Sequence, residues 1–310
     1  MYTYPAPPAT VSGGTTVEIH HLLKTPSLIA RRVRTLAAQR YIADVLLRGR
    51  FTAVGGAILY ETGEPITTDD SPEAVAPGGS YPKTTASGGE LAAAKTTKWG
   101  QDIPVFDEAI ARLGINPVER AFTKLVNQSV KFVDSAALGV IASKITQTFN
   151  ATGAGAPGAW TDGDAIVEGA LLAKAKVTAL DEGYDPNTIV LKDEQWAKAV
   201  ARLNAAGLLP REAGNPLITG IWPQALGLTW LSSNHTPSGN PLLVDADQLG
   251  GMADEEIGGP GYTRAGDGVG VETKAIRDDD HDGYNLRARR VTVPVVLEPN
   301  AGIIITNTGL

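Results

Sequence analysis

A short acidic run near the C-terminal end has residue types and spacing that suit a metal ion. Asp278, Asp280 and Asp282 stand at alternate positions and Gly283 follows them, as the carboxylates and the glycine do at the start of a calcium-binding EF-hand loop. That loop also needs a bidentate Glu at its twelfth position, which here is Arg289. Because a cation there repels calcium, the run favours a solvated turn between two strands, with a metal-dependent α/β enzyme as the less favoured hypothesis.

Other motifs resemble nucleophilic or cofactor sites, but their contexts argue against each. Ser80 and Lys83 have the serine and lysine spacing of penicillin-recognising enzymes, which works on a helix, and Pro82 lies between them. Residues 266–270 (GDGVG) lack the glycine spacing of a dinucleotide loop. There is no Cys, and the four His residues lack the i, i+4 pair of a zinc protease. We therefore predict no catalytic, cofactor-binding or metal-binding residue, and a protein that is not an enzyme.

Composition narrows the class of protein further. The 310 residues are 43% hydrophobic, enough for a large core, and the net charge of -7 argues against a dedicated nucleic-acid binder. No basic stretch followed by an apolar run marks a signal peptide, and no apolar run is long enough to span a bilayer, so we expect an aqueous, cytoplasmic setting. The 35 Gly and 20 Pro residues indicate that much of the chain is turns, arms and loops.

The elements that would position these residues are organised around one long predicted helix, Pro117 to Gln147. Pro117 suits a first helical turn, and apolar residues recur near the 3.6-residue period. A seven-residue register would place polar and glycine residues in the core, so a coiled coil fits poorly. Small residues at 136, 137, 139, 142 and 143 favour close contact with a flat surface, and we predict a spine helix lying across a sheet, with an ordinary buried helix of an α/β enzyme as the alternative.

The N-terminal part has little capacity to bury itself. Residues 1 to about 25 are predicted to form an extended arm, and a helix with an arginine-rich face follows from Pro26 to about Arg48. From Phe51 to Pro104 there is no helical period. Strands at 57–60 and 91–99 around a Gly- and Pro-rich segment predict a long projecting hairpin, which needs a partner to lie on.

The remainder alternates helices and strands. After a short helix at 107–113 and the spine, we predict helices at 164–181 and 193–204 and strands at 188–191, 228–232 and 242–245. Further strands are predicted at 269–276, 284–296 and 303–306, the last ones returning to the spine. Pro294 in the longest strand implies a bulge or an edge.

This order of elements resembles the major capsid protein of tailed bacteriophages, the Hong Kong 97-type fold, over nearly the whole chain. Local support comes from Ile103 to Ile110, from Trp196 with Leu203, and from the ending Arg287 to Val293 with Pro294, Glu298 and Pro299. The resemblance implies an α+β fold with an N-terminal arm and helix (1–51), an extended β-hairpin loop (52–102), a peripheral domain (103–159 and 276–310) with the spine helix 117–147, and an axial α/β domain (160–275).

The resemblance also implies a function and partners. The chain would be a structural subunit that assembles with itself into hexamers and pentamers and then into an icosahedral shell around double-stranded DNA, in the virion, after assembly in the host cytoplasm. A separate scaffolding protein, a portal protein and decoration proteins are implied partners. DNA contact would be non-specific, and no membrane or cofactor is implied. The alternative is an encapsulin-like compartment that holds a cargo enzyme.

Candidate contacts between subunits follow from the same resemblance. They are Arg31, Arg34, Tyr60, Lys83, Lys95, Lys98, Trp99 and Arg211. The loop 205–220 is the candidate for the capsomer centre. Some relatives join Lys to Asn covalently between subunits, but no matching partner for Lys83 can be established, and no crosslink is expected.

Overall fold

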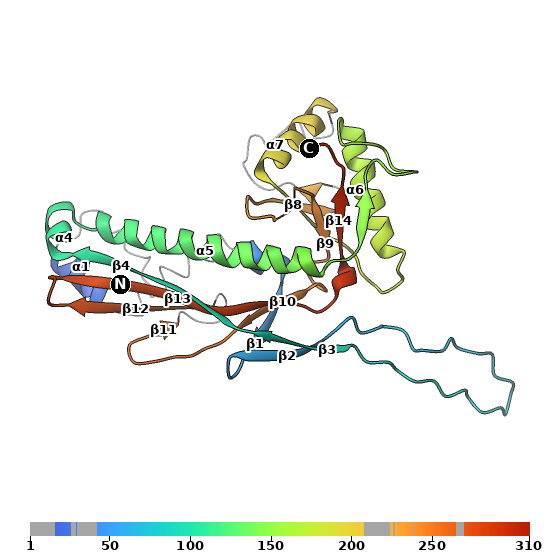
Figure 1. Ribbon diagram of the computed structural model, residues 1–310, viewed down its shortest axis with the longest axis horizontal. Coiled ribbons are helices and arrows are strands. Elements are labelled where there is room, and N and C mark those ends of the chain that lie inside the picture. The colour runs from blue at the N-terminus through green and yellow to red at the C-terminus, as the bar shows by residue number, and fades with distance from the viewer. Residues whose placement is uncertain are drawn as a thin grey trace, which may run out of the picture.

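The computed structural model describes residues 16–25, 29, 42–207, 224–225, 227–237, 239–264 and 270–310. These residues form a long body, a second unit above one end of it, and a hairpin that projects past that end (Figure 1). One hydrophobic core runs from the body into the second unit. None of the helices in these ranges is long and apolar enough to cross a membrane.

The spine helix is α5, Asn116–Lys144, with a proline in its first turn. The prediction is confirmed, although the helix ends at Lys144 because Ile145 is extended. The short helix α4, Asp107–Leu113, precedes it and stops at Gly114, whose φ is 64°. The small residues do not all face the sheet: a side chain at Gly139 would meet open space, and Ser143 is exposed.

The body is built on a six-stranded sheet whose longest strand is β13, Gly283–Val296. β13 pairs antiparallel with its three neighbours, and β1 is parallel to β10. The other strands are β1 (Gly49–Thr52), β10 (Gly250–Asp254), β12 (Val271–Asp278), β11 (Thr263–Arg264) and β4 (Thr97–Phe106). β4 pairs with β13 only as far as Thr292, so Pro294 lies where that side of β13 has become an edge, as predicted.

Alternation along β13 gives the sheet two different faces, because successive side chains of a strand point to opposite sides. The even-numbered residues, such as Leu286 and Ala288, belong to the main core with α5. The odd-numbered Val293 and Val295 belong to a separate small cluster that includes Tyr60 at the start of the projecting hairpin. The spine helix therefore covers one face, and the base of the hairpin covers part of the other (Figure 1).

The second unit is α/β, as predicted, and has a six-stranded sheet of its own. In spatial order its strands are β5 (Thr148–Asn150), β14 (Gly302–Thr306), β9 (Leu242–Val244), β6 (Thr188–Leu191), β8 (Leu228–Ser232) and β7 (Gln224–Ala225). Its helices are α6 (Gly163–Thr178) and α7 (Asp193–Ala205), and the 3-10 helix η1 (Pro299–Ala301) leads into β14. The side chain of Asp162 caps α6 by accepting a hydrogen bond from the Ala165 N–H at 2.8 Å.

The projecting hairpin consists of β2 (Ala57–Thr62) and β3 (Glu90–Lys95). Its existence was predicted, but the return strand is divided: β3 ends at Lys95, and β4 joins the main sheet from Thr97.

Two further expectations need correction, and one strand was not predicted. Residues 16–24 form a helix, α1 (Thr16–Lys24), rather than part of an extended arm. β14 does not return to the spine but pairs with β5 and β9 in the second sheet. β10 was not predicted. Of the predicted helix 26–48, the structure describes the segment from residue 42, with α3 at Ala43–Leu46, and residue 29; the rest lies outside the described residues, as do most of the loop 205–220 and residues 265–269.

Candidate assembly site

The projecting hairpin is the part of the chain with the fewest contacts of its own. β2 and β3 pair antiparallel from Ala57 opposite Lys95 to Thr62 opposite Glu90. Almost every residue of the connecting loop, 63–89, is exposed. A two-stranded ribbon of this kind is marginal in water, so its conformation depends on what lies against it.

Apolar side chains on the outer face of the hairpin have no cover in the described structure. Leu59 and Leu91 are 70% and 69% exposed, and in the loop Ile66 and Tyr81 are 63% and 83% exposed. The inner face is different, because Ile58 and Tyr60 pack against the small cluster at the main sheet. Exposed apolar surface of this extent is typical of an interface.

The base of the hairpin is fixed by hydrogen bonds to the loops that flank β10 and β13. Glu255 accepts from the Gly56 N–H at 2.9 Å and from the Thr96 hydroxyl at 2.7 Å, so one carboxylate holds both ends of the hairpin. On the other edge, the Thr62 hydroxyl donates to the Leu297 carbonyl at 2.7 Å. The hairpin therefore leaves the body in a set direction.

A second fastening lies further out, where Asp69 joins the two sides of the loop. The Ser87 hydroxyl donates to Asp69 at 2.7 Å, and the Thr85 hydroxyl donates to the same carboxylate. The bonds from Thr85 and Ser87 lower the pKa of Asp69. The loop thus stays an extended pair of segments up to this point.

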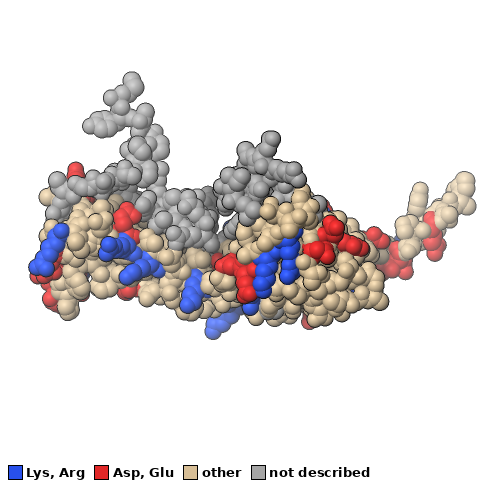
Figure 2. Space-filling view, turned by 90° about the horizontal axis from the view of Figure 1, so that it is seen from above, with Lys and Arg blue, Asp and Glu red and all other residues tan. Residues whose placement is uncertain are grey.

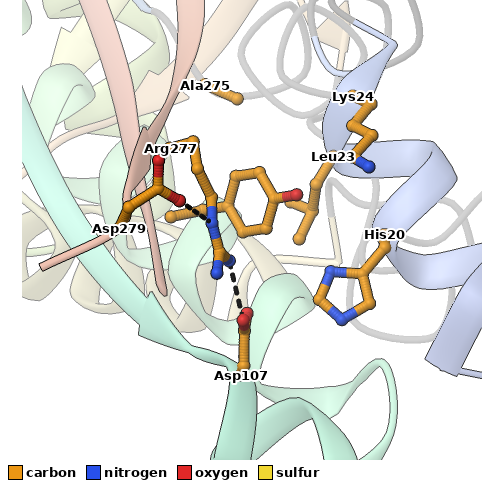
Figure 3. A pocket seen from close by; sticks show the side chains of 8 residues that line it. His20, Leu23, Lys24, Asp107, Ala275, Arg277 and Asp279 are labelled. Carbon is orange, nitrogen blue, oxygen red and sulfur yellow. Dashed lines mark hydrogen bonds and ion pairs between the residues drawn. The ribbon is translucent and has the colours of Figure 1, made fainter. Parts of the chain in front are cut away.

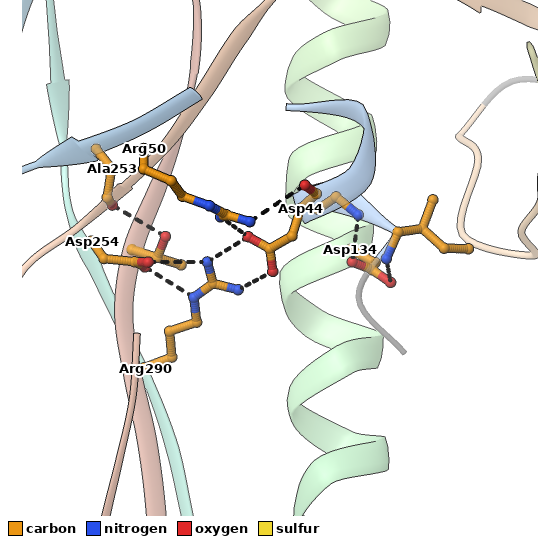
Figure 4. A network of polar contacts seen from close by, with 9 residues as sticks. Asp44, Arg50, Asp134, Ala253, Asp254 and Arg290 are labelled. Carbon is orange, nitrogen blue, oxygen red and sulfur yellow. Dashed lines mark hydrogen bonds and ion pairs between the residues drawn. The ribbon is translucent and has the colours of Figure 1, made fainter. Parts of the chain in front are cut away.

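A buried ionic network lies on the spine side of the main sheet, behind the hairpin (Figure 4). Arg290, only 1% exposed, donates to Asp254 at 2.9 Å and to both oxygens of Asp44 at 2.8 and 2.9 Å. Arg50 also donates to Asp44. Burial alone would raise the pKa of Asp44, but the hydrogen bonds and charge of Arg290 outweigh it and the pKa is lowered. The network ties the segment that leads into β1 to β10 and β13.

Asp134 is a charged residue inside the apolar stripe of α5. It is 1% exposed and accepts hydrogen bonds from the Ile42 and Ala43 N–H groups at 3.1 and 3.0 Å (Figure 4). These are donors at the start of α3 that a helix leaves without partners. Burial raises the pKa of Asp134 to about 6, although the two backbone bonds oppose the shift. The spine thereby holds the segment before β1 directly.

A pocket of about 520 Å³ lies at the opposite end of the body, between α1, α4 and the β12–β13 turn (Figure 3). His20 and Lys24 line one side, and Arg277 lies between Asp107 and Asp279, donating to them at 2.7 and 2.9 Å. The hydrogen bond to Asp107 raises the pKa of Arg277. Because the guanidinium is already paired with carboxylates, Arg277 fastens the turn to α4.

The acidic run forms the turn that the sequence favoured. β12 ends at Asp278 and β13 begins at Gly283, and Asp282 adopts a positive φ of 43°. Asp278 contacts His281 Nδ1 at 3.1 Å, and this contact lowers the pKa of Asp278. Within the described ranges no group of three or more His, Asp or Glu side chains could hold a metal ion. Ser80 and Lys83 lie in the exposed loop of the hairpin, outside any helix.

The structure does not gather the candidate intersubunit residues that it describes into one site. Lys83, Lys95 and Lys98 are exposed on the hairpin and at the start of β4. Tyr60 packs against the main sheet of the same chain. Trp99 stacks on Phe132 of α5, with ring centroids 5.7 Å apart. Arg31, Arg34 and Arg211 lie outside the described residues.

Sequence reasoning missed the ionic network and the anchors at the hairpin base. Asp134 was the one available signal, since a carboxylate within a continuous apolar stripe is rarely buried without partners. Arg290 and Glu255 gave no signal, because their partners are distant in the chain and appear only once β10 has paired with β13.

Three solved structures are similar to this chain across most of its length. They are a phage-related protein from Bordetella bronchiseptica (TM-score 0.59, 11% identity, covering 91% of this chain and 97% of that one), the capsid of cyanophage P-SCSP1u (0.57, 12%, 86% and 87%), and a virus-like particle from Pyrococcus furiosus (0.56, 8%, 89% and 97%). These similarities show the fold, which is the α+β fold of Hong Kong 97-type capsid proteins.

The family follows from the sequence match. Residues 90–305 match the family described as phage capsid protein, and because this span exceeds half of the chain, the chain belongs to the phage capsid protein family. It is a structural protein of a bacteriophage capsid, located in the virion. A comparison with curated protein sequences gives no match.

Proposed function

We propose that this chain is the subunit of an icosahedral shell, that it assembles into hexamers and pentamers, and that the shell encloses double-stranded DNA. The observation that carries the proposal is the hairpin, which hydrogen-bonds to the body at its base and keeps Leu59 and Leu91 exposed among the described residues. A second copy of this chain is the partner that accounts for both features. Each hairpin then lies on the next subunit.

Contacts of this kind close into rings. The hairpin of one copy and the surface that receives it are different patches, so the contact is heterologous, and a heterologous contact repeated around an axis gives a closed ring when the rotation fits. The long body with α5 would be the peripheral domain and the second sheet the axial domain that meets its copies at the capsomer centre. Assembly would take place in the host cytoplasm, with separate scaffolding and portal proteins.

Electron microscopy of the purified protein tests the proposal. The wild type is expected to form rings or shells, and a protein that stays monomeric would contradict the proposal. The double variant Leu59→Asp/Leu91→Asp is expected to stay small, because charges on the outer face of the hairpin oppose its burial. Leu113→Asp, at a residue 57% exposed at the end of α4, is the control and should assemble. Assembly by the double variant would remove the hairpin from the proposal.

The similarity to a virus-like particle supports an encapsulin-like compartment as the second candidate. The contents of the particles separate the two functions. Nuclease-resistant duplex DNA in particles from infected cells supports a genome container, and a co-purifying enzyme without DNA supports a compartment.

A further inference from the structure

One long face of α5 is turned away from the sheet and carries only basic and neutral polar side chains. The exposed residues along it are Asn116, Arg120, Lys124, Asn127, Lys131 and Ser135. At about 100° per residue, Arg120, Lys124 and Lys131 project within roughly 40° of one another, over about 16 Å of helix. We call these three residues the basic stripe. Figure 2 looks at the molecule from above and shows Lys and Arg side chains at intervals along its length, with Asp and Glu side chains between them.

The basic stripe has no acidic partner in the described part of the chain. None of its three residues appears in an ion pair there. The only acidic residues of α5 are Glu119 and Asp134, and Asp134 is buried against the segment before β1. A chain with a net charge of -7 thus gathers three basic side chains without an acidic partner among the described residues, and such a cluster attracts polyanions.

Two kinds of polyanion could bind the basic stripe: the phosphate backbone of DNA and an acidic segment of another copy of this chain. The hairpin of this chain is such a segment, since it carries Glu61, Glu64, Asp69, Asp70, Glu73 and Glu90. Its base, however, packs on the odd-numbered face of β13, whereas α5 covers the even-numbered face. In a shell one subunit thick, the hairpin and the basic stripe would thus lie toward opposite surfaces. This arrangement argues against the hairpin of a neighbouring copy and favours DNA, and a stripe that binds packaged DNA would lie on the surface toward the contents.

We infer that the basic stripe binds the phosphate backbone of packaged duplex DNA without reading its sequence. The inference rests on the proposed function and assigns the DNA contact to one face of one helix. Arg and Lys neutralise phosphates, and Asn and Ser side chains donate hydrogen bonds to phosphate oxygens. Each subunit adds only a few contacts, and the many copies of a shell make them effective together.

The size of the effect follows from counterion release. Three phosphate contacts give a slope of about -2.7 in log affinity against log salt concentration, so binding should weaken roughly 40-fold between about 50 and 200 mM salt. A subunit without the stripe should lose most of that slope.

The experiment measures binding of a short fluorescent DNA duplex, across that salt range, to the wild type and to Arg120→Gln/Lys124→Gln/Lys131→Gln. The matched control is Lys174→Gln/Lys176→Gln/Lys198→Gln, which removes the same charge from α6 and α7. The stripe variant should lose the affinity and most of the salt slope, and the control should keep both. Lys124→Arg/Lys131→Arg should also bind like the wild type, because it keeps the charges.

Three results would overturn the inference. Equal loss in the stripe variant and the control would mean that net charge alone matters. Retention of the full salt slope by the stripe variant would place the contact elsewhere. The third result is a stripe variant that keeps DNA binding but either loses binding to a peptide with the sequence of residues 61–73 or stops forming particles. Either outcome would show that the stripe binds an acidic segment of a neighbouring copy. The duplex assay can also be done with unassembled protein. A wild type that binds DNA through the stripe but never forms shells would therefore refute the proposed function and leave the DNA-binding inference standing.

Discussion

Replacement of Arg290 by Met should destabilise the subunit strongly at neutral pH. The guanidinium is 1% exposed and holds two carboxylates, Asp44 and Asp254, whose side chains are each 7% exposed. Methionine fills similar space but leaves Asp254 buried without its cation, and it leaves Asp44 with Arg50 alone, whose side chain is 41% exposed. Removing one partner of a buried ion pair costs about 3–5 kcal/mol, a large part of the stability of an ordinary domain.

The loss should depend on pH, with a sign that the structure fixes. In the wild type the pKa of Asp44 is lowered below the unfolded value of 3.8, so its contribution to stability is present above that value and lost as pH falls through the folded pKa. Without Arg290 the main opposition to the effect of burial is gone and only that of Arg50 remains, so the pKa of Asp44 should rise. Protonation then relieves the buried charge, and the difference between variant and wild type should shrink toward acidic pH.

Denaturant unfolding of the unassembled subunit at several pH values measures this difference. Arg287→Met is the matched control, because Arg287 lies on the same strand, faces the other side and pairs with Asp102 at a site where both side chains are 37% exposed. An exposed pair is worth at most about 1 kcal/mol. A loss at Arg290 no larger than that of the control, or a loss that stays constant from acidic to neutral pH, would refute the reasoning.

Two further predictions concern α5 and α6. The folded pKa of Asp134 is raised from 3.8 to about 6, so its contribution to stability is fully present below pH 3.8 and is lost as pH rises through 6. At 1.36 kcal/mol per pKa unit, this loss of stability is about 3 kcal/mol. The stability of the Asp134→Asn variant, measured over the same pH range, should not show this loss. Gly169→Ala should destabilise by about 1–3 kcal/mol, because its Cβ would lie 2.3 Å from Nε1 of the buried Trp160, whereas Gly139→Ala meets open space and should stabilise by up to about 1 kcal/mol. Equal unfolding midpoints for the two glycine variants would contradict this account of packing.

The elements that could be predicted from the sequence are those with strong local signals. The spine helix has a proline in its first turn and a long apolar period, and α4 has Gly114 at its end. The hairpin and the β12–β13 turn follow from clusters of turn residues. In each case the pattern lies within the segment itself, so no distant partner has to be known.

The elements that could not be predicted depend on contacts between distant segments. β10 contains Gly250 and Gly251, which suggest a turn, but a side chain at Gly251 would lie 2.3 Å from the Gly49 carbonyl oxygen. The glycine is there so that β1 can approach. β14 was assigned to the spine because the short strand β5 was not predicted and the pairing of β14 with β9 depends on segments that are distant in the chain. The arm predicted from the Pro- and Gly-rich first fourteen residues was extended to about residue 25, although residues 16–24 contain neither Pro nor Gly and form α1.

The end of β10 links the buried ionic network to the hairpin, through the consecutive residues Asp254 and Glu255. Asp254 points to the spine side of the sheet and binds Arg290, while Glu255 holds Gly56 and Thr96 at the base of the hairpin. The direction in which the hairpin leaves the body is therefore set by the same short strand that the buried network fixes against β13. In the proposed assembly the hairpin would reach a neighbour at the end of a long arm, so a small rotation at this strand would become a large displacement at the tip. We therefore expect a buried, directional ion pair to resist such a rotation better than apolar packing, which would explain a charged network in a position where burial alone makes charge costly.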